Sequence, residues 1–408
     1  MRPGMSSESY RIAIGALALA ASSAGHASDG ESPAVTPYAD LRYRLEVVDQ
    51  AGLPRTATAS TLRIRAGLKS AEWHGFTAVV EGETIVRLGP EDYNDTVNGR
   101  IAYPVVADPA DVLLNQAHLT WRPDAALAVT AGRQVVNLEN QRWIGSVGWR
   151  QNDQTLDAVR VSLAPAKGVS AEYVYAWRVN RVFGPDSAQG IWRGTDIHGA
   201  SVSIRVRPLG TVSAYGFFLD IPAQPAASSR TLGARFRGEQ AIGAGASLLY
   251  AAEYARQTDL AGNAADYALD YLLLEPGISM GGLTVRTGLE RLEGNGVTAV
   301  QSPLATLHAF NGWGDKFLVT PAGGLRDLYI DVGYRFSEGS PLNGLTLRGQ
   351  WHDFAATRGG ASYGRELGFL ATYPLRSNIV AMVKFAHYWA DGFATDTTKA
   401  WFSVEAKF

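Results

Sequence analysis

Cysteine is absent from the 408 residues of this sequence, and charge of either sign is not in excess. Without cysteine the fold cannot depend on disulfide bonds, which suits an exported chain held together by backbone hydrogen bonds. The formal net charge is −2, from 37 basic and 39 acidic residues. This balance lacks the basic excess of nucleic-acid-binding proteins, so no nucleic-acid partner is expected.

Long apolar runs are also missing, apart from one run near the N-terminus. Arg2 and Arg11 accompany the apolar stretch 12–21, and small residues follow as far as Ala27. This order is typical of a secretory signal peptide, and the apolar stretch is too short to span a bilayer as a helix. The sequence therefore predicts a signal peptide at 1–27. Because no other apolar stretch could span as a helix, a membrane role would require strands.

What the sequence does contain, from Tyr38 onward, is a recurring pattern of about ten residues that alternate between apolar and polar, followed by a break. In the first such segment Leu41 and Leu45 share one face, while Arg42 and Arg44 share the other. Alternation with a period of two places the charges on one side of a β-strand. About eighteen segments of this kind can be identified before the chain ends.

The connectors between these segments alternate between long and short. Long ones include 85–111, 135–154 and 292–324, whereas short ones include 165–168 and 208–210. If both termini are periplasmic, every short connector lies in the periplasm and every long one outside, as in outer-membrane β-barrels. A soluble β-sandwich is the alternative, but it has no reason to sort its connectors and rarely needs so many strands.

The sequence therefore predicts an all-β fold, namely a transmembrane antiparallel β-barrel of about 18 strands with both termini periplasmic, in a bacterial outer membrane. It would occupy residues 38–408, after a short periplasmic segment at 28–37. The last segment places apolar and aromatic residues on one face and ends at Phe408. Such an ending looks like the signal read by the barrel assembly machinery of the outer membrane. Aromatic residues near other strand ends, such as Trp121 and Tyr173, suit the depth of the lipid headgroups.

Charged residues on the expected inward faces are candidates for function. Arginine binds carboxylate and phosphate through paired hydrogen bonds, so an arginine-lined bore would favour anionic solutes. Acidic residues are nearly as frequent on these faces, and pairing between strands is expected for most of the arginines. The inward arginines retained as candidates are Arg42, Arg44, Arg160 and Arg348.

The connector 135–154 is rich in tryptophan and arginine. Exposing these rings to water is unfavourable, so the connector is expected to fold into the mouth of the barrel. Such a fold would bury Trp143 and Trp149 and direct Arg142 and Arg150 into the bore.

Three motifs carry a resemblance to a known family, and the first two are longer than chance readily explains. The first is discontinuous and consists of GRQ, QRWIG, WRQN and LDA at 132–134, 141–145, 149–152 and 156–158. The second is SPLATLHAFNGWGDKF at 302–317, and the third, which is weaker, is YGREL at 363–367. Together they resemble the alginate export family of outer-membrane porins over nearly the whole mature chain. The resemblance implies a monomeric barrel whose arginine-rich lumen passes an anionic polysaccharide. The residues that it implies at or near the constriction are Arg133, Arg142, Arg150 and Asp157.

One detail of the sequence conflicts with the implied position of Arg133, and another departs from that family. Arg133 shares the parity of the outward-facing Val129 and Ala131, so a local bulge or strand end would be required to bring it inside. The long periplasmic turn thought to gate the alginate exporters is replaced by the short stretch 374–377. The sequence therefore lacks the segment that would act as the gate of an alginate exporter.

The expected function is a channel for anionic saccharides, such as the exopolysaccharide alginate, or for other small anionic solutes. Its expected partners are outer-membrane lipids and periplasmic secretion proteins. A structural or adhesive barrel is the first alternative. An enzyme is less favoured, because the seven histidines are scattered without the spacing of a nucleophilic or metal site. A siderophore-type transporter would need a folded plug ahead of the barrel, whereas only the segment 28–37 is expected between the signal peptide and the first strand. No cofactor is expected, and the acidic residues Glu91, Asp92 and Asp95 do not have the spacing of a calcium motif.

Overall fold

The computed structural model describes residues 34–408. The expected signal peptide at 1–27 and the first part of the expected segment 28–37 lie outside the described residues. Within them, almost all regular structure is β-strand, and none of the helices is long and apolar enough to cross a membrane.

The eighteen strands have the following bounds: β1 (Val35–Gln50), β2 (Ala57–Ser70), β3 (Phe76–Arg87), β4 (Asp111–Trp121), β5 (Leu127–Gln134), β6 (Thr155–Ala166), β7 (Val169–Asn180), β8 (Ile191–Val206), β9 (Gly210–Asp220), β10 (Ser229–Gly243), β11 (Ala246–Asp259), β12 (Ala268–Met280), β13 (Leu283–Leu292), β14 (Leu325–Arg335), β15 (Thr346–Ala355), β16 (Ser362–Arg376), β17 (Ile379–Ala390) and β18 (Thr397–Lys407). Two short 3-10 turns, η1 (Pro225–Ala227) and η2 (Leu307–Ala309), lie in connectors.

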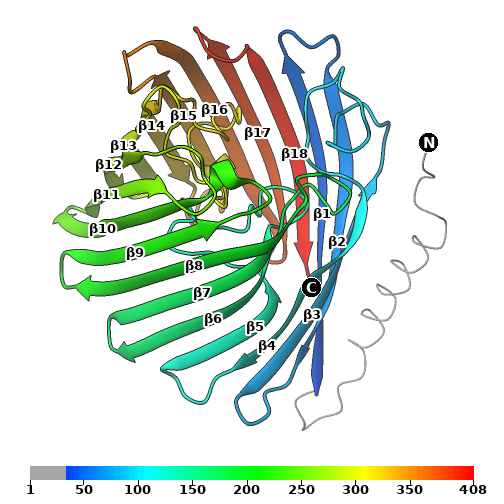
Figure 1. Cartoon of the computed structure of the whole chain (residues 1–408), viewed down its shortest axis with the longest axis vertical. Coiled ribbons are helices and arrows are strands. Elements are labelled where there is room, and N and C mark those ends of the chain that lie inside the picture. Colours follow the sequence, from blue (N-terminus) through cyan, green and yellow to red (C-terminus); the bar gives the residue numbers. More distant parts are fainter. Residues whose placement is uncertain (1–33) are drawn as a thin grey trace.

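The strands form one closed ring (Figure 1). Each strand pairs antiparallel with the next one along the chain, and β1 also pairs with β18. The register of this closing seam runs from Asp40 opposite Lys407 to Gln50 opposite Thr397. The predicted fold class, an antiparallel β-barrel of about 18 strands, is confirmed.

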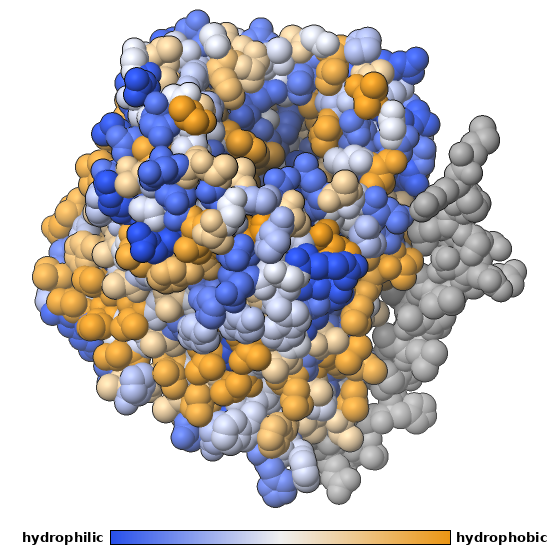
Figure 2. All heavy atoms as spheres, viewed as in Figure 1, coloured by the Kyte–Doolittle hydropathy of each residue, from blue (hydrophilic) through white to orange (hydrophobic). Residues whose placement is uncertain are grey.

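Burial along the strands is inverted relative to a water-soluble barrel. The inward side chains of Arg44 and Glu46 have exposed fractions of 2% and 0%, whereas the outward Leu68 and Leu328 are 54% and 50% exposed. Figure 2 shows hydrophobic residues gathered over the outer face of the strands, most clearly at the left and lower parts of the view. An outer wall this apolar around a charged interior is typical of a barrel surrounded by hydrocarbon.

The two ends of the barrel carry different connectors. One end, which we call the long-loop end, bears the connectors 88–110, 135–154 and 293–324. The opposite short-turn end bears tight turns such as 167–168, although its turn at 336–345 is longer than the sequence suggested. The predicted alternation of long and short connectors is confirmed, and it places the larger segments at one mouth of the bore.

Two of the long connectors turn back into the barrel. Ile144 of 135–154 and Leu304 of 293–324 belong to one buried apolar cluster, which also contains Val174 of the wall. In Figure 1 the yellow segment around residue 310 lies inside the ring of strands. Because a barrel of this size otherwise encloses a wide aqueous bore, these two connectors determine how much of it stays open.

Candidate functional site

The connectors 135–154 and 293–324, which we call the inner loops, are joined to each other inside the barrel. Ile144 and Leu304 form a parallel bridge, and the amide of Gly145 donates to the carbonyl of Leu304 over 2.8 Å. The side chain of Gln154 donates to the same carbonyl over 2.9 Å. In return, the amide of Thr306 donates to the carbonyl of Gln141 over 3.1 Å. These bonds make the inner loops a single unit across the bore.

Two arginines of the barrel wall fasten the first inner loop. Arg42 donates to the carbonyl of Gly148 over 2.9 Å and to the side chain of Gln151 over 3.0 Å. Arg44 donates to the carbonyl of Trp149. A guanidinium group has five donors in a fixed plane, so it can hold several backbone carbonyls of a loop that lacks regular structure. Both predicted candidates are therefore buried anchors of the loop rather than groups that face solute.

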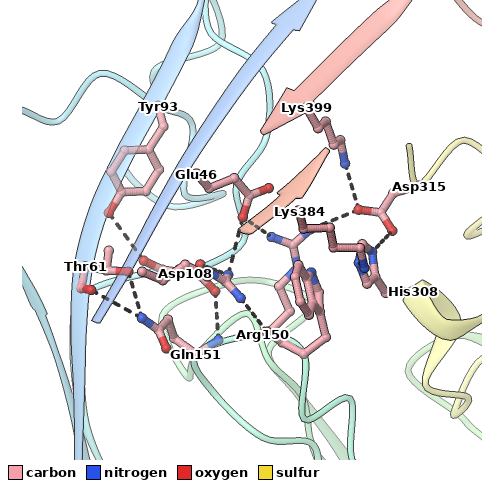
Figure 3. Close-up of polar contacts among 12 residues, drawn as sticks. Glu46, Thr61, Tyr93, Asp108, Arg150, Gln151, His308, Asp315, Lys384 and Lys399 are labelled. Carbon is pink, nitrogen blue, oxygen red and sulfur yellow. Dashed lines mark hydrogen bonds and ion pairs between the residues drawn. The ribbon is translucent and has the colours of Figure 1, made fainter. Parts of the chain in front are cut away.

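A third long connector adds a carboxylate to this anchor. Asp108 of 88–110 pairs with Arg44 and accepts a hydrogen bond from the amide of Gln151 over 3.0 Å (Figure 3). Burial acts to raise the pKa of Asp108, but the charges of Arg44 and Arg150 outweigh it and hold the pKa below its ordinary value. Asp108 is therefore a permanent anion that neutralises part of the arginine charge at this level.

Arg142 joins the inner loops to the opposite wall. Its Nε lies 2.7 Å from Oε1 of Glu290, and its Nη2 donates to Oδ1 of Asn311 over 3.1 Å. The guanidinium also lies over the ring of Phe310 at 4.8 Å. Burial lowers the pKa of Arg142, but Glu290 outweighs this and raises it above its ordinary value. Only 1% of Arg142 is exposed, so its role in the structure is to hold the loops together.

Arg150 lies closer to open space than Arg142 does. Its two terminal nitrogens lie 3.2 Å from Glu46 and 3.3 Å from Asp315, which belongs to the second inner loop (Figure 3). The pKa of Arg150 is raised because these carboxylates outweigh its burial. Arg150 therefore bridges the wall and the second inner loop, and it lines a cavity at the long-loop end.

A chain of polar contacts that sequence reasoning missed runs through His308. Nζ of Lys384 lies 2.7 Å from Nε2 of His308, and Nδ1 of His308 lies 2.7 Å from Oδ1 of Asp315 (Figure 3). Lys399 reaches the other oxygen of Asp315 over 2.7 Å. Burial lowers the pKa of His308 to about 3, so the ring is neutral. The neutral ring donates from Nδ1 to Asp315 and accepts at Nε2 from the amino group of Lys384.

Tryptophan rings surround the same lysine. Nζ of Lys384 lies 3.9 Å from the ring centroid of Trp313 and 4.1 Å from that of Trp149. Each tryptophan comes from a different inner loop, whereas Lys384 comes from β17. The amino group of Lys384 therefore lies between the indole rings of both inner loops. The sequence signal that could have identified this site is the inward parity of Lys384 on β17 and Lys399 on β18. Neither strand contains an arginine.

A cavity of about 370 Å³ opens above the inner loops at the long-loop end. Apolar and aromatic residues supply part of its lining, including Tyr103, Phe183 and Leu307. Arg150, Lys316 and Lys399 supply positive charge to the same cavity. Burial, with help from Lys399, lowers the pKa of Lys316 to about 8. We call this space the outer chamber, and its charged groups are mainly basic.

On the opposite side of the inner loops lies a second cavity of about 310 Å³. Arg235, Arg286 and Arg348 line it together with carboxylates such as Glu290 and Asp331. Toward the short-turn end a third cavity, of about 640 Å³, is lined by further arginines, including Arg205 and Arg237. Arginine side chains therefore continue along the inner wall of the barrel, from the inner loops toward the short-turn end.

Two of the predicted inward arginines pair with acids of neighbouring strands. Arg160 lies 2.6 Å from Glu172 and Arg348 lies 2.6 Å from Asp331. Arg348 is the more open of the two, with 42% of its side chain exposed, and it also lies over the ring of Trp313 at 5.5 Å. Arg348 is therefore the predicted residue that lines the second cavity.

Arg133 and Asp157 are not at the constriction, which corrects the position implied by the resemblance. They stand opposite each other in register and form a two-pronged ion pair, at 2.7 and 3.0 Å. The neighbours of Asp157 along β6, Leu156 and Ala158, both belong to the interior cluster, so Asp157 faces outward. The pairing between β5 and β6 has no bulge here, and Arg133 therefore keeps its outward parity.

The acidic loop residues Glu91 and Asp92 are paired with residues of their own connector and of the adjoining end of β3. Glu91 lies within ion-pair distance of Arg87 and Arg100, and Asp92 accepts a hydrogen bond from Tyr103 over 3.0 Å. Within residues 34–408 no cluster of three or more potential metal ligands is found.

Comparison with known proteins identifies the fold. OpdL of Pseudomonas aeruginosa superposes with a TM-score of 0.69 at 16% identity, over 92% of this chain and 98% of OpdL. OccAB4 of Acinetobacter baumannii gives 0.72 at 14% identity, over 93% and 100%. OpdK of Pseudomonas aeruginosa, solved with vanillate, gives 0.69 at 15% identity, over 91% and 98%. The fold is thus that of the outer-membrane porins.

Sequence comparison is less informative. No family model matches the chain, and no curated protein matches it significantly. The structural neighbours described above are Opd and Occ proteins, so the resemblance to the alginate export family extends to the porin fold but gains no support beyond it.

Proposed function

We propose that this protein is an outer-membrane channel for small anionic solutes, with its short turns and both termini in the periplasm. The observation that carries this proposal is the basic outer chamber above the inner loops. Arg150, Lys316 and Lys399 all line it. A concave site of one charge sign concentrates solutes of the opposite sign at its entrance.

Location in the outer membrane is supported by the inverted burial and by the fold. Charged residues of the strands are buried inside and leucines are exposed outside, which suits lipid contact rather than water. The porins that share the fold support the same placement.

A solute that combines a carboxylate with an apolar or aromatic body fits the chamber best. The basic residues can pair with the carboxylate, while Tyr103, Phe183 and Leu307 offer apolar contacts. OpdK, which shares the fold, was solved with vanillate, an aromatic carboxylate. This agreement supports small aromatic or aliphatic acids as cargo.

Two other functions have specific observations in their favour. An anionic polysaccharide such as alginate is supported by the sequence motifs, but the inner loops occupy the bore that a polymer would need. A structural barrel without transport is supported by the many ion pairs that fasten these loops, such as Arg142 to Glu290. Conductance separates the channel from the structural barrel, and competition between solutes separates small acids from the polymer.

The decisive experiment is recording from the purified full-length protein in planar bilayers under a salt gradient. We expect ion conductance with a reversal potential that shows anion preference. Vanillate should reduce the chloride current at lower concentration than uronate oligomers, and neutral sugars should have little effect. Insertion without conductance would reject the channel, and stronger block by uronate oligomers would favour the polysaccharide.

A further inference from the structure

Two groups of arginines lie on the outer wall of the barrel, at the long-loop end and outside the bore. In each group three arginines and one aspartate lie on four consecutive strands, and two of the three arginines contact the aspartate. Wall group 1 consists of Arg133 on β5, Asp157 on β6, Arg178 on β7 and Arg193 on β8. Wall group 2 consists of Arg291 on β13, Arg326 on β14, Asp353 on β15 and Arg365 on β16.

In wall group 1 a single carboxylate is shared by two of the three guanidinium groups. Arg133 takes both oxygens of Asp157, and Nε of Arg178 lies at 3.7 Å from the same carboxylate. Arg193 stands opposite Arg178 in register and has no carboxylate within ion-pair distance among the described residues. Nε of Arg178 is also buried without a hydrogen-bond partner in this part of the chain. The group therefore has a surplus of positive charge and an unused donor.

A bulge in β7 turns Arg178 to the outside. Val174 and Ala176 face the interior cluster, and so does Val179, although it has the opposite parity. The register between β7 and β8 shifts between Ala176 and Arg178, which accounts for the change. Arg178 consequently shares the outer face with Asp157.

Wall group 2 repeats the arrangement on the other side of the barrel. Arg326 lies 2.9 Å from Asp353 and Arg365 lies 3.2 Å from its other oxygen. Arg291 stands opposite Arg326 in register and forms no ion pair within residues 34–408. The side chain of Arg365 is 63% exposed, so the group is open to its surroundings.

Both groups lie next to aromatic residues of the outer wall. Trp389 stands opposite Arg365 in register. Trp351 lies two residues before Asp353 on β15, so both side chains are on the outer face. In β7, Tyr175 and Trp177 precede Arg178. Exposed tryptophan and tyrosine mark the depth at which lipid headgroups begin. Unpaired arginine is unfavourable deeper in hydrocarbon, and at this depth it meets the headgroups.

We propose that the two wall groups bind phosphate groups of the lipids that surround the long-loop end, specifically a phosphorylated saccharolipid. This inference rests on the proposed function, because the outer-membrane placement decides which leaflet meets this end. A phosphate carries up to two negative charges, which match the surplus of three arginines over one aspartate. Its oxygens accept paired hydrogen bonds from guanidinium groups.

The same end of the outer wall also contains a natural comparison. Arg256 pairs one-to-one with Asp270 at 2.7 Å, and both are exposed. This pair has the same residue types in a similar setting but no surplus charge. It is therefore the matched control for a test of the two groups.

The test measures retention of lipid by the full-length protein in detergent, with diphosphoryl lipid A, fully dephosphorylated lipid A and phosphatidylglycerol as probes. One variant combines Arg178→Gln, Arg193→Gln, Arg291→Gln and Arg326→Gln. The control variant combines Arg256→Gln with Asp270→Asn. Folding of each is checked by the shift in electrophoretic mobility on heating, and conductance is recorded in parallel.

We expect the wild-type protein and the control variant to retain diphosphoryl lipid A, and the quadruple variant to bind it at least about tenfold more weakly. Dephosphorylated lipid A should bind the wild-type protein as weakly, a comparison that needs no variant. Equal retention of both forms of lipid A, or preference for phosphatidylglycerol, would overturn the inference. Conductance should be the same in all variants. Absence of conductance would reject the proposed channel without affecting the lipid measurement. Failure of the proposed function and failure of the lipid inference are therefore distinguishable.

Discussion

Nζ of Lys384 and Nε2 of His308 lie 2.7 Å apart, which links the barrel wall directly to the second inner loop. The ring centroid of Trp149, in the first inner loop, lies 4.1 Å from the same Nζ. A single side chain of β17 therefore contacts both inner loops. How tightly these loops close the bore depends on this lysine.

Lys384→Met should loosen the inner loops. Methionine retains the length of the side chain but loses the hydrogen bond to His308, a loss of about 1 kcal/mol. We expect larger and noisier single-channel currents in planar bilayers. Lys407→Met changes an exposed lysine and serves as the control. Currents identical to those of the wild type would mean that Lys384 does not hold the constriction.

Arg150→Gln should weaken anion preference. Arg150 lines the outer chamber, and loss of one charge near a solute in water changes the interaction by about 1 kcal/mol, or about fivefold in the permeability ratio. Reversal potentials under a salt gradient measure this ratio. Arg55→Gln, which changes an arginine paired with Tyr103 near the rim, is a suitable comparison. An unchanged ratio in Arg150→Gln would place the selective step elsewhere in the bore.

Arg142→Leu should act on stability rather than on selectivity. The substitution leaves Glu290 buried without its partner, which costs about 3–5 kcal/mol. Denaturant-induced unfolding in detergent should show this loss. Adding Glu290→Gln should recover part of it, because the unpaired charge is removed. A large change in reversal potential with unchanged stability would contradict the assignment of Arg142 as a loop anchor.

Anion preference should decrease above about pH 8. Burial lowers the pKa of Lys316 to about 8, so this lysine is charged at lower pH and becomes neutral as the pH rises through that value. The outer chamber then loses one of its positive charges. Reversal potentials recorded from pH 6 to pH 10 should show the transition in the wild type and not in Lys316→Met. A transition that persists in the variant would have another origin.

The sequence predicted the fold well because alternation along a strand is a local property. It placed Arg42 and Arg44 inside from their neighbours alone, and their burial agrees. Alternation cannot show what lies opposite an inward residue across the bore. Both arginines are covered by the returning loop 135–154, so groups that looked available to solute are anchors.

The candidate site was predicted only in part for the same reason. Arg150 and Arg348 line cavities, but Lys384, Lys399 and His308 meet only because two loops distant in sequence fold back together. Arg133 illustrates a different limit. Its outward parity was correct as read from β5, and the motif resemblance implied an inward position that the register does not allow.

The pairing of β1 with β18 has a consequence for biogenesis. The contact that closes the ring joins the two strands farthest apart in sequence. Every assembly intermediate that precedes this contact therefore presents two unpaired strand edges. Such edges are not tolerated in hydrocarbon, and contacts between distant segments form slowly. The ring must therefore be completed where another protein or water pairs with the open edges, and shortening β18 would be expected to arrest assembly rather than to yield a smaller pore.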